Sequence, residues 1–348
     1  MSLVSINLLT YNGSRFIEKC LASVFGQSYL KIEFLIIDNR SQDNTVVIIQ
    51  EIISRANPKF PVRFIQNDKN TGFAAGHNQG ISQSKGEFVL CLNQDAILAP
   101  DFVEKAVKLF SEKKDEKIAA IQPKILRLNE KLEPTEIIDT TGLVVLKNRR
   151  IIGHGQGQID KGQYAIMDEI FGVDGAAPIF KREALEDVKL PFDFAQGINS
   201  VYEYFDEDFF LYKEDVDLAW RLRLYGWKTF FAPDVKAWHA RGAGDSAAIN
   251  YISIIKERRK ISNFAKYLSF RNQRLMQIKN ELPSLFLKHS PRLFFKEIGA
   301  WVYVILFEHF TLKVIGDLIK FTPKAFRKRK IIMQEKKVDA KEMGRWFV

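Results

Sequence analysis

Residues 3–12 read Leu-Val-Ser-Ile-Asn-Leu-Leu-Thr-Tyr-Asn, and this stretch decides the fold class. Its first seven residues form a short apolar run without charge, which predicts a buried strand. Thr10-Tyr11-Asn12-Gly13 is typical of a turn, and apolar residues at helical spacing follow from Phe16 to Val24. Strands that are buried on both faces belong to parallel sheets covered by helices. The chain therefore opens like an α/β protein.

The same pattern repeats along the first hundred residues. We expect buried strands at 33–37, 62–65 and 88–92, with a helix at about 43–55. This alternation predicts a mostly parallel sheet with helices on both faces, in which ligands bind at the carboxyl ends of the strands. Polar residues follow the strands at these ends: Thr10-Tyr11-Asn12, Asp38-Asn39, Asn67 to Gly72, and Asn93-Gln94-Asp95.

The pattern changes further along the chain. Residues 129–172 are richer in Gly and predict loops or a bulged hairpin, and another strand starts within 174–180. A strand over 228–232 is followed by Pro233 and a further short strand that reaches Trp238-His239. Beyond residue 250 the pattern is helical throughout.

Composition and charge narrow the class of protein. With 46% hydrophobic and 27% charged residues the chain is an ordinary globular protein, which excludes disordered, collagenous and disulfide-rich classes. Cys20 and Cys91 stand among apolar residues, so we expect buried thiols in a reducing compartment. The net charge is +10. Residues 251–348 carry 22 basic and eight acidic residues, which gives +14 there and −4 in residues 1–250.

The basic C-terminal region either contacts something anionic or is simply solvated. The N-terminus has no signal-peptide pattern. The longest uncharged run in the apolar stretch 293–321 is Ile298 to Phe307, about half of what a membrane span needs. An amphipathic helix lying in a membrane interface is compatible with this stretch, and a basic cluster follows at 324–330.

Two groups of residues are candidates for chemistry. Asp95 follows a buried strand, where one carboxylate and substrate phosphates can hold Mg²⁺ or Mn²⁺; the alternative is a turn or helix cap. Glu214, Asp215 and Asp217 begin a helix, where acids are favoured by the helix dipole. Crowded acids in apolar surroundings can also provide a general base. His239 is either structural or a third ligand beside Asp95.

Together these segments resemble the family 2 inverting glycosyltransferases, in their rhamnosyltransferase-like branch. The similarity covers about residues 3–280 and rests on several motifs in order. The motifs are Val4 to Asn12, Leu35 to Asp43, Asn70-Thr-Gly72-Phe73-Ala-Ala-Gly76-His-Asn78-Gln-Gly80, Asp139 to Gly142, Gly155 to Gln158, Gly175 to Leu185, and Phe210 to Arg221.

The resemblance implies a GT-A fold, with a nucleotide-sugar half at 1–98, an acceptor half at 99–250 and a helical basic region at 251–348. It assigns donor binding to Thr10, Tyr11, Asn12, Asp38, Asn39, Asn70, Gly72, Phe73, Asn78, Asn93 and Gln94. It assigns the metal to Asp95 and His239, acceptor binding to Gly175, Ala176 and Glu214, and catalysis to Asp215 as base with Glu214 beside it. Asn93 stands where the family has the first Asp of D-x-D.

The implied function is a Mn²⁺- or Mg²⁺-dependent inverting transfer of a sugar, L-rhamnose as the leading expectation, from a dTDP- or UDP-sugar. The acceptor would be a glycan or an isoprenoid-lipid-linked glycan of a cell-surface polysaccharide. We expect a cytoplasmic enzyme, peripheral at the inner face of the cell membrane, that binds no nucleic acid. Two alternatives are a nucleic-acid binder that uses the basic region and a sugar nucleotidyltransferase, although the latter's Gly-rich triphosphate loop is absent from residues 5–15.

Overall fold

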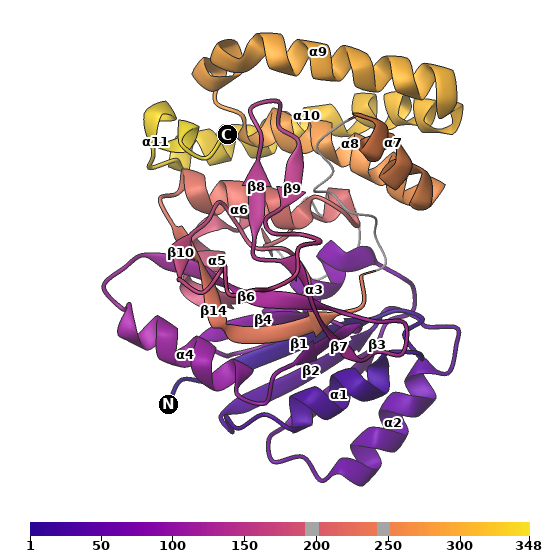
Figure 1. The fold of residues 1–348 in the computed structure, drawn as a ribbon, viewed down its shortest axis with the longest axis vertical. Coiled ribbons are helices and arrows are strands. Elements are labelled where there is room, and N and C mark those ends of the chain that lie inside the picture. The colour runs from indigo at the N-terminus through magenta and orange to yellow at the C-terminus, as the bar shows by residue number, and fades with distance from the viewer. Residues whose placement is uncertain (192–201, 242–250) are drawn as a thin grey trace.

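A computed structural model describes residues 1–191, 202–241 and 251–348, and a ten-stranded sheet lies at its centre (Figure 1). The strand order is β10-β14-β6-β11-β4-β1-β2-β3, with β5 paired to β14 and β7 paired to β6. The strands are β1 (Val4–Thr10), β2 (Ile32–Asp38), β3 (Val62–Gln66), β4 (Phe88–Asn93), β5 (Ala96–Leu98), β6 (Ile118–Leu128), β7 (Pro134–Thr140), β10 (Asp168–Glu169), β11 (Ile179–Lys181) and β14 (Lys228–His239). Two small pairs stand apart, β8 (Leu143–Val145) with β9 (Ile151–Gly153) and β12 (Leu190–Pro191) with β13 (Tyr202–Glu203).

The central strands are mostly parallel, as the apolar runs predict. The strands β1 to β4 pair in parallel, β6 and β14 pair in parallel, and β11 runs antiparallel between β4 and β6. In the register, Thr10 lies opposite Asp38, and Leu9 lies opposite Asn93. Consequently the polar residues that follow β1, β2 and β4 meet at one edge of the sheet.

Helices cover both faces of the sheet (Figure 1). One apolar core contains residues of α1 (Ile17–Phe25), α2 (Thr45–Ala56) and α4 (Phe102–Glu112). A second core, on the other face, contains residues of α3 (Gly72–Gln83), α5 (Arg182–Val188) and α6 (Glu214–Leu224). Cys20 and Cys91 are buried free thiols, as expected.

The residues beyond 250 are helical, which confirms the prediction. They form α7 (Tyr251–Lys260), α8 (Asn263–Asn280), α9 (Pro283–Phe307), a 3₁₀ turn η3 (His309–Lys313), α10 (Val314–Glu335) and α11 (Ala340–Gly344). Met276 of α8 and Ile332 of α10 are fully buried in the same core as Trp220 of α6. The C-terminal helices therefore share a core with the sheet. The expected boundary near residue 250 falls outside the described residues.

The two longest strands, β6 and β14, differ from what the sequence predicts. The central strand β6 carries Pro123, which has no N–H for a ladder and obscured the pattern. Residues 228–239 form one strand, β14, rather than two, so that expectation was wrong. Its register against β6 shifts between Ala232 and Lys236, because Pro233 interrupts the ladder there without ending the strand.

Candidate active site

The turn after β1 is tied to the turn after β4 through Gln94. The side-chain oxygen of Gln94 accepts hydrogen bonds from the Thr10 hydroxyl at 2.6 Å and the Tyr11 N–H at 2.9 Å, and its amide donates to the Tyr11 carbonyl at 3.0 Å. A Cβ at Gly13 would stand 2.1 Å from Gln94 Oε1, so a larger residue there would displace the Gln94 side chain from these hydrogen bonds. The structure thus brings together three residues expected at the donor site.

Asp38 and Asn12 organise the neighbouring turn. The Asp38 carboxylate accepts hydrogen bonds from the N–H and hydroxyl of Ser41. Asn12 has φ of 50°, its N–H donates to Ser41 Oγ at 2.9 Å, and its side chain accepts from the N–H of Gln42 at 2.8 Å. The Tyr11 side chain beside them is 40% exposed, so its aromatic ring is accessible for stacking with a nucleobase.

Asn39 connects this edge to the loop that begins α3. Its amide donates to the Gly72 carbonyl at 2.9 Å, and its oxygen accepts from the Thr71 hydroxyl at 3.0 Å. Asn70 accepts from the N–H of Gly72 at 2.9 Å. Gly72 has φ of +84°, and a Cβ there would stand 2.5 Å from the Phe210 carbonyl oxygen. The loop 70–73 is therefore fixed between β2 and the segment before α6.

Asn78 has another task than the expected one. Its amide oxygen accepts from the N–H groups of Tyr204 and Phe205, and its NH₂ donates to the Phe205 carbonyl and to Glu207 at 2.9 Å. Because these groups occupy its hydrogen-bonding capacity, we leave Asn78 out of the donor site proposed below.

Asp95 and His239 face each other across the β5–β14 pair. His239 Nε2 lies 3.2 Å from Asp95 Oδ1, and His239 Nδ1 lies 2.9 Å from Asp139 Oδ2. Burial alone would lower the pKa of His239, but Asp95 and Asp139 raise it to about 10. The second carboxylate, Asp139, fixes the orientation of the imidazole ring, an arrangement typical of histidine ligands.

A chain of charged side chains continues from this pair toward α6. Arg241 donates to Asp139 and lies 3.5 Å from Asp174 Oδ2. Asp174 immediately precedes Gly175 and is close enough to raise the pKa of Asp215. Sequence reasoning assigned no role to Asp139, Asp174 or Arg241, although Asp139 begins one of the quoted motifs.

Asp215 lies beside Gly175 and Phe73. A Cβ at Gly175 would stand 3.8 Å from Asp215 Oδ2 and 3.5 Å from the Phe73 ring. The N–H of Val216 donates to Asp215 at 2.7 Å, and the N–H of Gly175 also donates to it. Burial, with the charge of Asp174, raises the pKa of Asp215 to about 6. A residue expected at the donor, one at the acceptor and the expected base thus meet.

The remaining residues expected at the site are Asn93, Ala176 and Glu214. The Ala176 carbonyl accepts the Asn93 N–H at 3.0 Å, so these two residues join β4 to the segment before β11. Glu214 is buried, and burial together with the charge of Asp215 raises its pKa well above the usual range. The protonated form of Glu214 is therefore favoured by its surroundings.

The backbone before Asp215 is strained. Phe210, Tyr212 and Lys213 have φ of 63°, 70° and 75°, a region that L-residues seldom adopt. Asn272 of α8, which is fully buried, donates to the carbonyls of Phe209, Leu211 and Tyr212 at 2.8–2.9 Å. These bonds hold the loop 209–213 in a conformation that it would not keep unaided.

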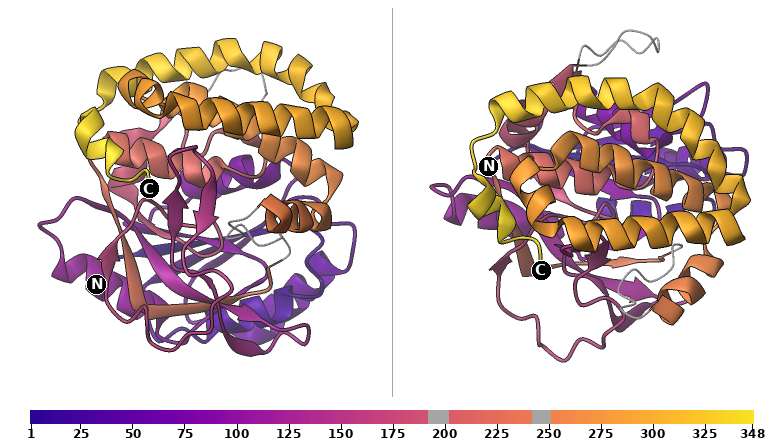
Figure 2. Two further views of the ribbon diagram at one scale, coloured as in Figure 1. Left: turned by 45° about the horizontal axis from the view of Figure 1, so that its top comes forward. Right: turned by 90° about the horizontal axis from the view of Figure 1, so that it is seen from above.

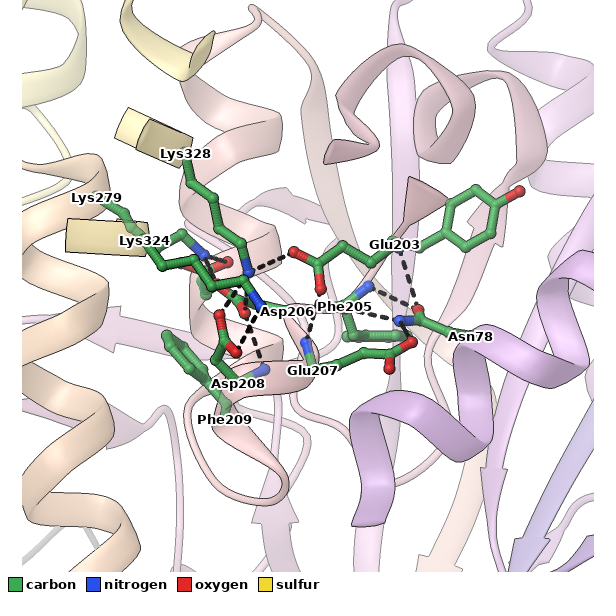
Figure 3. A network of polar contacts seen from close by, with 12 residues as sticks. Asn78, Glu203, Phe205, Asp206, Glu207, Asp208, Phe209, Lys279, Lys324 and Lys328 are labelled. Carbon is green, nitrogen blue, oxygen red and sulfur yellow. Dashed lines mark hydrogen bonds and ion pairs between the residues drawn. The ribbon is translucent and has the colours of Figure 1, made fainter. Parts of the chain in front are cut away.

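Four acids of segment 203–217 are bound by lysines of the C-terminal helices, three of them labelled in Figure 3: Glu203, Asp206, Asp208 and Asp217. Lys328 Nζ lies 2.5 Å from Glu203 Oε1, 2.5 Å from Asp206 Oδ1 and 2.9 Å from Asp208 Oδ2. Lys279 contacts Asp206 and lies 2.8 Å from Asp217 Oδ2, and Lys324 contacts Asp208. Although burial alone would raise the pKa of Asp206, the two lysines hold it below its usual range.

This network changes the interpretation of two sequence features. The acids around Phe205 and Phe209 are indeed not a solvated face, but most of them are partners of buried lysines rather than catalytic groups. Asp217 is bound by Lys279, by Arg221 at 3.2 Å and by Asn280 at 2.7 Å. Part of the anionic partner of the basic region belongs to the same chain, since Lys279, Lys324 and Lys328 bind its acids.

Comparison with known proteins shows the family of this chain. The model of glycosyl transferase family 2 matches residues 5–188, which is more than half of the chain. The chain belongs to glycosyl transferase family 2. Poly-beta-1,6-N-acetyl-D-glucosamine synthase of Staphylococcus epidermidis is 27% identical over 237 residues, which cover 68% of this chain and 49% of that protein. The chain spans about half the length of the curated relatives it matches.

Solved structures confirm the GT-A fold. TarS 1-349 of S. aureus in complex with UDP-GlcNAc superposes with a TM-score of 0.53 at 17% identity, covering 99% of this chain and 89% of that one. The mannosyltransferase PcManGT from Pyrobaculum calidifontis, in complex with GDP-Man and Mn²⁺, superposes with a TM-score of 0.52 at 16% identity, covering 96% and 86%.

Proposed function

We propose that this family 2 glycosyltransferase is a metal-dependent inverting enzyme in which Asp215 is the general base. The observation that carries the proposal is the position of Asp215. Its raised-pKa carboxylate lies beside Gly175 and Phe73, and side chains connect this place to the Asp95–His239 pair. A carboxylate with a pKa of about 6 is ionised at neutral pH and still basic enough to accept a proton.

Asp95 and His239 fit a divalent ion that is shared with the substrate. The Asp95 Oδ1 and His239 Nε2 atoms face each other and would supply one carboxylate and, once the ion displaces the proton from Nε2, one imidazole, donors that Mn²⁺ accepts. Within the described residues no group of three or more His, Cys, Asp or Glu side chains could hold a metal ion. Two protein ligands leave coordination positions for diphosphate oxygens. Mn²⁺ present in the PcManGT structure supports this assignment. A bound ion would neutralise the departing diphosphate.

The donor would occupy the edge formed by the β1, β2 and β4 turns. Thr10, Tyr11, Asn12, Asp38 and Asn39 would hold the nucleoside, and the loop from Asn70 to Phe73 with Asn93 and Gln94 would enclose the sugar diphosphate. We keep a dTDP- or UDP-sugar as donor, with L-rhamnose as the leading candidate sugar. UDP-GlcNAc bound in TarS supports a nucleotide-sugar of this class.

In the reaction, Asp215 would take the proton from an acceptor hydroxyl as the hydroxyl oxygen attacks the anomeric carbon. The bond from this carbon to the diphosphate breaks on the opposite side, so one displacement inverts the centre. Glu214, next to Asp215, would contact the acceptor, and Gly175, which has no side chain, together with Ala176, would leave room for it. The acceptor would be a glycan or lipid-linked glycan, consistent with the polysaccharide synthases among the relatives.

The organisation that we propose is a nucleotide-sugar half (1–98), an acceptor half (99–250) and a C-terminal helical region (251–348). The enzyme would work in the cytoplasm at the inner face of the membrane. The alternative of a nucleic-acid binder gains no support, because lysines of the basic region are bound to Glu203, Asp206 and Asp208.

A panel of nucleotide sugars tests the function. We expect a dTDP- or UDP-sugar to raise the melting temperature and Mn²⁺-dependent nucleotide release to be lost in Asp95→Ala. Asp215→Asn should bind the donor like the native protein but turn over at least about 100-fold more slowly, the lower range for loss of a general base. Full turnover in Asp215→Asn would overturn the assignment. Tight DNA or RNA binding without any nucleotide-sugar binding would overturn the function.

A further inference from the structure

Helix α9 carries a continuous apolar stripe on its solvent side. The stripe consists of Leu287, Phe294, Phe295, Ile298, Val302, Ile305 and Leu306, whose side chains are 45–73% exposed. At 3.6 residues per turn these positions fall on one side of the helix. From 287 to 306 the α9 stripe is about 30 Å long, at 1.5 Å per residue.

The opposite side of α9 holds the helix to the protein. Leu285, His289, Leu293 and Val304 are buried. The Trp301 ring packs edge-on against Phe270 of α8 at 5.0 Å, and Glu297 binds Arg274 of α8 at 2.6 Å. Figure 1 shows α9 farther from the sheet than α8, and the view from above in Figure 2 shows it uncovered beside α8. The α9 stripe therefore faces outward from an anchored helix.

Exposed apolar area of this kind is unusual. Soluble monomers seldom expose a contiguous apolar patch larger than a few hundred Å², and larger ones mark binding surfaces. The seven side chains of the stripe include no polar group. On α10, Ile315, Ile319 and Phe326 are also 48–73% exposed. The stripe thus requires a partner that is itself apolar.

The charges around the stripe indicate what kind of partner it binds. Lys288 and Arg292 on α9, Lys313 in η3 and Lys320 on α10 are exposed, and none makes an ion pair with a residue that the structure describes. Three acids near the stripe, in α9, at its C-cap and in the first turn of α10, are paired with arginines of α7 and α8 instead. Their pairs are Glu297 with Arg274, Glu308 with Arg258, and Asp317 with Arg271. The surface that borders the stripe is therefore cationic.

A second copy of the chain fits this surface poorly, because it would bring like charges together around the apolar contact. An anionic bilayer matches both properties, since its acyl region takes the apolar side chains and its headgroups attract Lys and Arg. No single described helix is long and apolar enough to cross a membrane. Pro283–Phe307 and His309–Glu335 qualify only as a pair, and that pair is bent by 116°.

We propose that the α9 stripe docks on an anionic lipid bilayer, with α9 lying along the interface. The proposal deepens the proposed function, on which its purpose rests, because a lipid-linked acceptor would be presented at such a surface. It also places the membrane contact on α9 rather than on the basic cluster at 324–330, in which Lys324 and Lys328 bind Asp208.

Co-sedimentation of the full chain with vesicles tests the proposal. The native protein should pellet with phosphatidylcholine–phosphatidylglycerol vesicles, less so at high salt, and should stay in solution with pure phosphatidylcholine. The double variant F294S/F295S should bind at least about tenfold more weakly, since each buried Phe contributes a factor of this order. K288Q/R292Q should weaken binding to the anionic vesicles and reduce its salt dependence.

Matched controls distinguish binding through the α9 stripe from nonspecific hydrophobic or electrostatic binding. Ile166 is 82% exposed outside the stripe, so I166S should bind like the native protein, as should K114Q/K161Q. Nucleotide release without vesicles should be unchanged in F294S/F295S, which separates failure of docking from failure of the proposed activity. Native protein that stays in solution with anionic vesicles would overturn the proposal. A native dimer that F294S/F295S converts to monomer would also overturn it, in favour of a second copy.

Discussion

Replacing Lys279 by Met should sharply destabilise the fold, because Lys279 joins two buried acids. Its ammonium contacts Asp206 and lies 2.8 Å from Asp217 Oδ2, and all three side chains are at most 1% exposed. Removing one member of a buried ion pair typically costs 3–5 kcal/mol, since the other charge stays buried without a partner. Asp206 keeps Lys328 and Asp217 keeps Arg221. We therefore expect the lower end, about 3 kcal/mol.

Urea unfolding followed by circular dichroism measures this loss. With a slope near 3 kcal/mol per molar, the upper value for small proteins, Lys279→Met should lower the midpoint by about 1 M. Lys288→Met is the matched control, because this lysine is exposed on α9 and should change stability by less than about 0.5 kcal/mol.

A double-mutant cycle with Asp206→Asn isolates the interaction free energy between Lys279 and Asp206. Losing Lys279 should cost less once Asp206 is neutral, and the coupling should be at least about 1 kcal/mol for groups in direct contact. The reasoning fails if Lys279→Met unfolds at the same urea concentration as Lys288→Met, or if the two substitutions add without coupling.

Three further predictions concern activity. Burial and Asp174 raise the pKa of Asp215 to about 6, and Lys213 and Glu214 also face this carboxylate. Because the base must be ionised, kcat/KM should fall tenfold per unit of pH below about 6 and be constant above it. A pH–rate profile that does not fall at low pH would contradict Asp215 as base. Asn272→Leu should lower kcat more than it raises the donor KM, because three carbonyls of the loop 209–213 lose their donor, while Asn263→Leu at the start of α8 should not. Gly72→Ala should weaken nucleotide-sugar binding and cost about 1–3 kcal/mol of stability, seen by calorimetry, because its Cβ would meet the Phe210 carbonyl at a φ of +84°.

The parts of this fold that the sequence predicts are those whose cause is local. Uncharged runs such as 3–9 and 88–92 can only be strands of a covered sheet, and the polar residues after them must share its edge. Strand β6 escaped notice because Pro123 conflicts locally with a strand that tertiary packing nevertheless stabilises. Asp95 and His239 are 144 positions apart, and the resemblance to a family, rather than any local pattern, placed them together.

Long-range ion pairs could not be predicted in the same way. The opposite signs of segment 203–217 and of the C-terminal region are visible in the sequence, but sign alone does not say which lysine meets which acid. Asp206 and Lys279 are 73 positions apart and Asp206 and Lys328 are 122 apart. Such contacts depend on how α8 and α10 pack on α6, which is set by buried residues such as Met276 and Ile332.

The C-terminal helices consequently have two roles that their charge alone would not separate. On the inner side, Asn272, Lys279 and Lys328 hold the segment that ends in Asp215, so removing residues 251–348 would leave buried acids unpaired and the loop 209–213 without its donor. On the outer side, α9 presents only apolar and cationic groups. Because the same helical region holds the loop before Asp215 and contacts the bilayer, it would fix the distance of Asp215 from the lipid. That distance would determine which acceptor hydroxyl Asp215 can reach.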